Sequence, residues 1–137
     1  MKDHYSAIDD TVSVSGQVQP SNISGLSKHG FAWLVNHRPD GEEPGQPSAG
    51  SLGAAAETEG LRYLHAPVRG LPEDEAVAAT ARVLASLGPG EKVLMFCRSG
   101  MRSSAAWAMA RARAGVPADE LRARAAAAGY DLSRLPL

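Results

Sequence analysis

Short apolar runs alternate with longer segments of helical period along the chain, and this alternation predicts its elements. Strands are expected at residues 11–15, 31–35, 61–67 and 93–96. The runs at 31–35 and 93–96 are apolar throughout, which is typical of strands buried on both faces of a sheet. Residues 11–15 instead alternate, with Val12 and Val14 as their apolar positions, and this pattern predicts a half-exposed or edge strand.

Helices are predicted between and after these strands. They are expected at residues 20–29, 48–59, 72–87, 102–114 and 117–128. Proline near the first turn or glycine beyond the last turn marks most of their ends. Strands that alternate with helices indicate an α/β fold, in which right-handed crossovers place helices on both faces of a parallel sheet. We expect one domain over residues 1–137, with a loose lead-in at 1–10, which is polar and has no period.

Charge and cysteine content narrow the possible partners. The formal net charge of -1 argues against nucleic acid or a membrane surface as the main partner. A single cysteine excludes an internal disulfide and fits a reducing compartment, so we expect a cytoplasmic protein. No apolar run approaches the length needed to span a bilayer. The histidines show no ligand spacing among themselves or with Cys97, so no metal and no other cofactor is expected.

The strongest candidate for chemistry is the segment 93–103, whose pattern predicts a strand, a tight loop and the start of a helix. Cys97 lies at the carboxyl end of the predicted strand, where open α/β sheets place their ligands. Loop amides, the helix dipole and Arg102 would then face one point and favour a thiolate with an anion beside it. The alternative is an inert buried cysteine. Two guanidiniums, two hydroxyls and a glycine in the next six residues argue against it.

The other residues of this loop are candidates for anion binding: Arg98, Ser99, Gly100, Met101 and Ser103. Arg98 either steers the anion or is a solvated surface residue. Arg102 either stabilises the thiolate and its anion or is a structural charge at the helix end. Ser99 and Ser103 are candidate donors to the thiolate, although Ser103 equally suits the first turn of a helix. Gly100 would let the backbone approach the ligand. The direction of the bulky methionine stays open.

A second polar loop follows the strand at 31–35. Residues 36–47 hold three prolines and two glycines, which exclude regular structure, and loops of this length in a compact domain are often functional. The carboxyl ends of parallel strands meet at one edge of a sheet, so Gln17, this loop, Arg69 and the Cys97 loop should share one rim. The candidate rim residues are His37, Arg38, Asp40 and Arg69.

Two motifs far apart in the chain are similar to those of a known family. Residues 36–47 read NHRPDGEEPGQP, residues 97–103 read CRSGMRS, and Pro-Val stands at 67–68. Together they resemble the beta-lactamase-hydrolase-like, phosphatase-like domain family, from about Val12 to Leu132. The resemblance implies a three-layer α/β/α, protein-tyrosine-phosphatase-like fold with a four-stranded parallel sheet in the order 1-4-2-3. It implies either a phosphatase or a rhodanese-like sulfurtransferase, the latter alone or fused to a persulfide dioxygenase, which is therefore an expected partner.

Three features favour sulfur transfer within this family. Protein tyrosine phosphatases have a Cys-to-Arg loop one residue longer than the loop from Cys97 to Arg102, whose four intervening residues match the loop length of rhodaneses. Phe96 stands where phosphatases place a histidine. Residues 68–71 include no acid to protonate a leaving oxygen. The leading hypothesis is that Cys97 takes a sulfane sulfur from thiosulfate or a persulfide and passes it to an acceptor thiol. Its substrate would be a small thiol or sulfur anion.

Two alternatives remain open. The first is a cysteine-dependent phosphatase, a hydrolase that forms a cysteinyl-phosphate on Cys97, with Asp40 or Glu42 as an unorthodox acid. The second is an inactive module that binds a persulfide-handling partner through the same rim.

Overall fold

In a computed structural model that describes residues 5–137, one mixed sheet has the strand order β1-β2-β5-β3-β4. The strands are β1 (Tyr5–Ala7), β2 (Val12–Ser15), β3 (Phe31–Asn36), β4 (Arg62–His65) and β5 (Lys92–Phe96). Strands β2, β5, β3 and β4 run parallel to one another, and β1 pairs antiparallel with β2. The expected parallel order 1-4-2-3 is therefore confirmed for these four strands, and β1 is an additional edge strand.

The edge strand corrects two expectations. Residues 5–7 are not part of a loose lead-in, because they pair with β2, and the Tyr5 ring packs edge-on against Phe31 at 5.1 Å between centroids. Residues 1–4 lie outside the described part of the chain. Strand β2 is not an edge strand either. It pairs with β1 on one side and with β5 on the other, and all four of its residues are buried.

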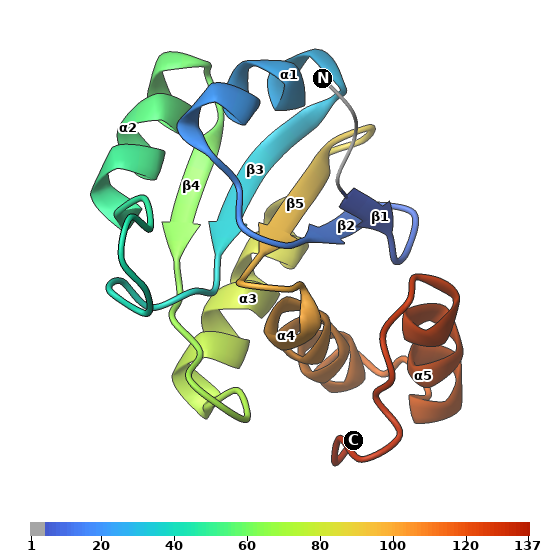
Figure 1. Ribbon diagram of the computed structural model, residues 1–137. Coiled ribbons are helices and arrows are strands. Elements are labelled where there is room, and N and C mark those ends of the chain that lie inside the picture. Colours follow the sequence, from blue (N-terminus) through green and yellow to red (C-terminus); the bar gives the residue numbers. More distant parts are fainter. Residues whose placement is uncertain (1–4) are drawn as a thin grey trace.

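The helices cover both faces of the sheet (Figure 1). They are η1 (Pro20–Asn22), α1 (Ile23–Lys28), α2 (Ala49–Thr58), α3 (Asp74–Ser86), α4 (Met101–Arg113) and α5 (Ala118–Ala127), η1 being a single 3-10 turn. Helices α1 and α2 lie on one face and α3 and α4 on the other, while α5 packs against the outer side of α4. Every predicted helix is present within a few residues of its expected bounds.

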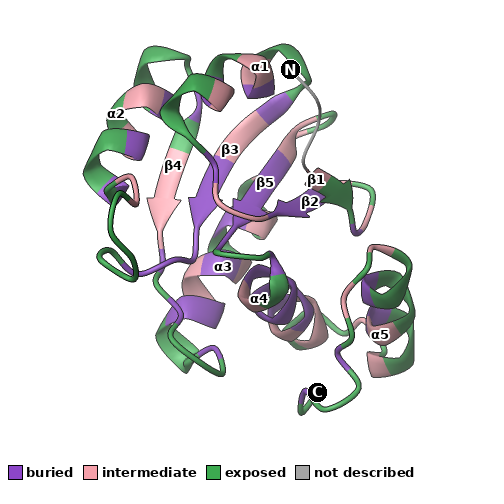
Figure 2. Cartoon of the chain, in the orientation of Figure 1, coloured by how far each residue is buried: buried purple, intermediate pink, exposed green. Residues whose placement is uncertain are grey.

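Alternation along β5 divides the core into two halves. Val93 and Met95 pack with residues of α3, α4 and α5, whereas Leu94 and Phe96 pack with residues of α1 and α2. All four are buried (Figure 2). Because both faces of β5 are covered, its residues 93–96 are apolar throughout rather than alternating. Burial of each large side chain stabilises the fold by about 1.5–3 kcal/mol, so β5 is held firmly where it ends.

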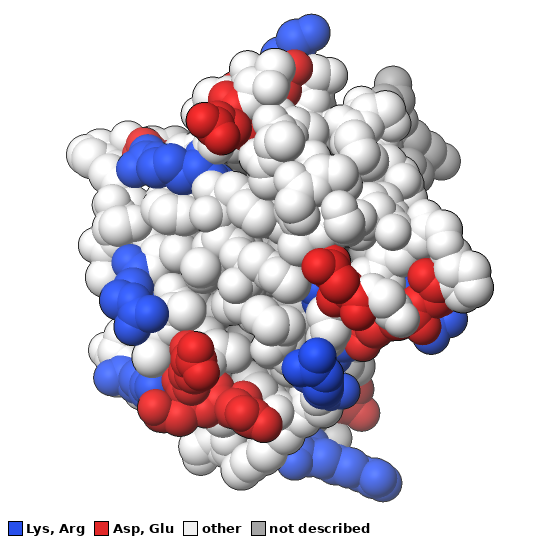
Figure 3. Space-filling view, turned by 90° about the vertical axis from the view of Figure 1, so that its left-hand side faces the viewer, with Lys and Arg blue, Asp and Glu red and all other residues white. Residues whose placement is uncertain are grey.

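The four parallel strands end at the same edge of the sheet, where β5 runs into the loop before α4 (Figure 1). The segments that follow β2, β3, β4 and β5 therefore meet there, as the sequence predicts. On the face shown in Figure 3, acidic and basic side chains lie near one another around an uncharged centre, with no extended field of one sign. Within residues 5–137, no helix is both long enough and apolar enough to cross a membrane.

Candidate active site

Cys97 lies directly after β5 and is fully buried. The chain then turns at Gly100, whose φ of 97° lies in the left-handed region that favours glycine, and α4 begins at Met101. The Gly100 N–H donates to Cys97 Sγ at 3.1 Å. Both this contact and the positive N-terminal end of α4 favour negative charge on the sulfur.

The Cys97 loop is seated against the end of β2. The Cys97 amide donates to the Ser15 carbonyl at 3.4 Å. A Cβ atom on Gly16 would lie 3.0 Å from the Arg98 carbonyl oxygen, closer than side chains normally approach. Gly16 therefore permits the close approach of the two segments, and a larger residue would push the loop outward.

Arg102 lies in the first turn of α4, and its guanidinium is held by two acceptors. Nη1 and Nη2 each donate at 2.8 Å to an oxygen of Glu42, and Nη1 also donates to the Val68 carbonyl at 2.7 Å. The hydrogen bond with Glu42 and the charge of Cys97 both raise the pKa of Arg102. The guanidinium is therefore a fixed positive charge next to the sulfur.

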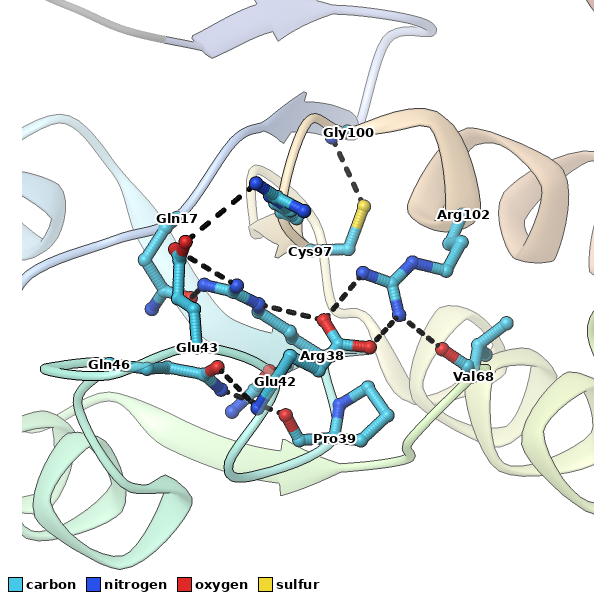
Figure 4. A network of polar contacts seen from close by, with 12 residues as sticks. Gln17, Arg38, Pro39, Glu42, Glu43, Gln46, Val68, Cys97, Gly100 and Arg102 are labelled. Atoms are coloured by element: carbon cyan, nitrogen blue, oxygen red, sulfur yellow. Dashed lines mark hydrogen bonds and ion pairs between the residues drawn. The ribbon is translucent and has the colours of Figure 1, made fainter. Parts of the chain in front are cut away.

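Glu42 joins Arg102 to a second arginine, as Figure 4 shows with the carboxylate between the two guanidinium groups. Arg38 is 1% exposed and donates to Glu42 at 2.9 Å, to Gln17 at 2.9 Å and to Glu43 at 3.0 Å. Hydrogen bonds from Arg102 and Arg38 lower the pKa of Glu42 to about 2. Glu42 is thus ionised at neutral pH.

His37 was expected on the rim, but that prediction is wrong because its side chain is fully buried. Its Nε2 lies 2.9 Å from Thr80 Oγ1, and its Nδ1 lies 2.8 Å from Ser103 Oγ. Thr80 donates its only hydroxyl proton to Ala76, so Nε2–H must donate to Thr80 and Nδ1 must accept from Ser103. Burial, followed by the charges of His65 and Arg102, lowers the pKa of His37 to about 3.

The bond to His37 also corrects the role expected for Ser103. The Ser103 hydroxyl proton points to the histidine, so Ser103 is not a donor to the Cys97 thiolate in this arrangement. Ser99 accepts from the Met101 amide at 3.4 Å through its side-chain oxygen, which leaves its hydroxyl proton free for another acceptor. Of the hydrogen bonds found within residues 5–137, the one that reaches the sulfur from the loop backbone comes from Gly100.

The remaining candidates lie farther from the sulfur or are engaged elsewhere. Asp40 accepts from the Ala49 amide at 2.7 Å and so holds the start of α2. Arg98 is exposed and pairs with Glu43 at 3.7 Å. Arg69 lies along a separate hollow between β4 and α3. Met101 lines another hollow together with Arg102, Leu71 and residues of the segment that follows α5. Within residues 5–137, no group of three His, Cys, Asp or Glu residues is arranged to hold a metal ion.

Tyr130 is a neighbour of the loop that the sequence analysis missed. It follows α5, and its hydroxyl donates to the Ser99 carbonyl at 3.1 Å. Nothing in the local sequence points to this contact, because it depends on how α5 packs against α4. Gly129 ends the last helix directly before the tyrosine, but it predicts only the helix end and not the contact.

The parallel order of the four strands, the buried cysteine at the end of the central β5 and the arginine in the first turn of α4 define a cysteine-phosphatase-like domain. The chain belongs to the family described as beta-lactamase hydrolase-like protein, phosphatase-like domain, whose model matches residues 4–114. A beta-lactamase hydrolase-like protein from Xylella fastidiosa is 35% identical over 93% of this chain. The chain spans 30% of that relative's length.

Solved structures agree with this assignment. A candidate phosphatase from Neisseria meningitidis is 29% identical, with a TM-score of 0.78 over 93% of this chain and 89% of its own. Tk-PTP in its active form has a TM-score of 0.73 at 21% identity, over 94% of this chain and 86% of its own. The second similarity shows that the two proteins share a fold.

Proposed function

We propose that this domain is a cysteine-dependent phosphatase that hydrolyses phosphomonoesters through a cysteinyl-phosphate on Cys97. The observation that carries the proposal is the pairing of the buried sulfur with the Gly100 amide and the fixed Arg102 guanidinium. A phosphate ester offers equatorial oxygens that suit an arginine fork and backbone N–H donors. The fold shared with phosphatases supports the same reaction class.

In the first step the Cys97 thiolate attacks phosphorus. The sulfur–phosphorus bond forms, the ester oxygen leaves as an alkoxide or phenoxide, and Arg102 stabilises the charge on the phosphoryl oxygens. In the second step water attacks phosphorus and the thiolate leaves, which releases inorganic phosphate and returns the nucleophile. Neither step needs a metal ion.

The state of the nearby carboxyl groups defines the substrate class. The low pKa of Glu42 keeps that group ionised, and Asp40 accepts a hydrogen bond from the start of α2, so neither is poised to protonate a leaving oxygen. A positioned acid contributes roughly a hundredfold or more to such reactions. Esters whose leaving group is already a stable anion are therefore the favoured substrates, and aryl phosphates are preferred to alkyl phosphates.

Sulfur transfer is the second candidate, and specific features favour it. Four residues separate Cys97 from Arg102, Phe96 precedes the cysteine, and residues 68–71 contain no acid. A sulfane sulfur donor such as thiosulfate releases sulfite, a stable anion that needs no proton. The ionised Glu42 is compatible with that reaction as well.

One pair of assays separates the two chemistries. We expect p-nitrophenyl phosphate to be hydrolysed at least about a hundredfold faster than glycerol phosphate, with a phosphorylated Cys97 trapped at low pH. Cys97→Ser should abolish both turnover and trapping. In parallel, incubation with thiosulfate should leave the mass of the intact protein unchanged.

Each other result assigns a different function. A gain of one sulfur atom that cyanide removes, without phosphate release, would replace the phosphatase by the sulfurtransferase. If folded protein showed neither phosphate release nor sulfur uptake, the domain would be a binding module without catalytic activity.

A further inference from the structure

The peptide group that joins Ser99 to Gly100 is held at both ends. Its N–H, which belongs to Gly100, donates to Cys97 Sγ at 3.1 Å. Its carbonyl, which belongs to Ser99, accepts from the Tyr130 hydroxyl at 3.1 Å. Because a peptide group is planar, a rotation that broke one of these bonds would turn the other group away from its partner.

We propose that Tyr130 is a positioning residue for the nucleophile: its hydroxyl holds the Ser99–Gly100 peptide so that the Gly100 amide points at Cys97. The inference rests on the proposed role of Cys97 as a thiolate nucleophile. Tyr130 would support that role through the backbone of the Cys97 loop, without touching the substrate itself.

The position of Tyr130 is set by the end of α5 rather than by the loop that it contacts. Gly129 has a φ of 101°, its amide donates to Ala126 at 3.0 Å, and the Tyr130 amide donates to Ala125 at 2.8 Å. This pair of bonds is the Schellman arrangement, which fixes the direction of the chain beyond a helix. The family model ends at residue 114, so this support for the loop comes from a segment beyond the matched region.

The loop leaves room for the tyrosine. A Cβ atom on Gly100 would overlap the Tyr130 hydroxyl, so glycine at this position allows both the left-handed turn and the contact. Burial, and after it the charge of Cys97, raises the pKa of Tyr130. The hydroxyl therefore keeps its proton at neutral pH and remains a donor to Ser99.

The test removes the single hydroxyl with Tyr130→Phe and follows alkylation of the one cysteine by iodoacetamide. Loss of the bond should weaken the amide contact to the thiolate, and we expect alkylation at pH 7 to slow by about fivefold, the effect of one hydrogen bond. At about pH 9.5, where an ordinary thiol is ionised without help, the two rates should converge. Tyr5→Phe is the matched control, because it removes a tyrosine hydroxyl that contacts His29 and not the Cys97 loop, and its rate should equal that of the wild type.

Two results would overturn the inference. One is an unchanged rate at pH 7 in Tyr130→Phe protein with a normal melting temperature. The other is an equal loss of rate at both pH values, which would mean altered access to the cysteine rather than altered ionisation. Faster hydrogen exchange of the Gly100 amide in Tyr130→Phe, but not in Tyr5→Phe, is expected alongside the change in rate. Alkylation needs no phosphate ester, so a wild type that lacks phosphatase activity would sink the proposed function and leave this inference standing.

Discussion

Two carboxylates bind arginines at opposite ends of the parallel strands, and their surroundings differ. Asp9 precedes β2 and accepts from Trp107 at 2.7 Å and Arg111 at 3.0 Å, besides two backbone amides. Glu42 follows β3 and accepts from the guanidinium groups of Arg38 and Arg102. One carboxylate thus ties a strand to α4, and the other lies among the residues that surround Cys97.

Asp9 makes contacts that hold the fold together, whereas Glu42 contacts an arginine that is a candidate for substrate binding. Burial alone would raise the pKa of Asp9, but hydrogen bonds from Trp107 and Thr11 and the charge of Arg111 bring it below its usual value. All of these donors belong to the framework. At Glu42 the donors are two arginines, one of which also responds to the charge of Cys97. Arg102 lies beside the candidate nucleophile, where it can exchange a carboxylate for a substrate anion, whereas Arg111 joins α4 to Asp9 and Thr11.

Arg102→Lys should give the largest effect that this comparison predicts. Lysine keeps the positive charge but lacks the planar guanidinium group. The site would therefore lose its bidentate donor to the phosphoryl oxygens of the substrate. We expect kcat/KM for p-nitrophenyl phosphate to fall by roughly a hundredfold or more, as when a preorganised donor is removed. Urea unfolding should show a much smaller change in stability.

Arg111→Lys is the matched control for that measurement. It makes the same replacement in the Asp9 network, where it should leave kcat/KM unchanged. If both variants lost activity equally, the two networks would not differ in kind, and Arg102 would be reassigned to the support of α4.

Asp9→Asn should give the next largest effect, and it should appear in stability rather than in activity. The amide cannot accept from Trp107 and Arg111 as the carboxylate does, and bonds to a charged acceptor contribute about 1.5–3 kcal/mol. We expect the free energy of unfolding to fall by about 2 kcal/mol. Glu42→Gln, whose side chain is 26% exposed, should cost less stability. A reversed order of the two losses would contradict the assignment of Asp9 to the framework.

The sequence predicted well those features that depend on neighbouring residues. The apolar run of β5, the cysteine after it and the helix that follows are contiguous, so the candidate nucleophile, its loop and Arg102 could be placed together. The four parallel strands were also predicted, two of them from continuous apolar runs and β2 from its alternation. Strand β1 was missed because three partly exposed residues without apolar alternation form a strand only by pairing with β2.

The features that could not be predicted depend on tertiary contacts. A histidine in a polar loop looks exposed, and His37 is buried only because Ser103 and Thr80 come from two helices to meet its ring nitrogens. Glu42 looked like a possible acid until the structure showed it between two arginines. Tyr130 reaches the loop through the packing of α5, which no spacing in the sequence reveals.

The sequence features that favour sulfur transfer and the fold differ in how much of the chain they involve. The features that favoured sulfur transfer are local: the loop length, Phe96 and the missing acid at 68–71. The fold is a property of the whole chain, and it matches phosphatases over nearly all of its length. The loop length, Phe96 and the missing acid are departures within the phosphatase-like family to which the whole chain belongs.

The smallest predicted effect concerns His37, which touches Ser103 of the site from the core side, and it appears as a pH dependence of stability. Because burial lowers its pKa from 6.5 to about 3, the native state keeps the imidazole neutral while the unfolded chain takes up a proton below about pH 6.5. Stability is therefore complete above that pH and falls as the pH drops toward 3. From pH 7 to pH 5.5 the expected loss is about 1 kcal/mol. Urea unfolding at the two pH values should show this loss in the wild type and little of it in His37→Gln, in which the other titrating groups are unchanged. Equal losses in both proteins would mean that His37 accepts a proton in the folded state, and the orientation assigned to the Ser103 hydroxyl would then be wrong as well.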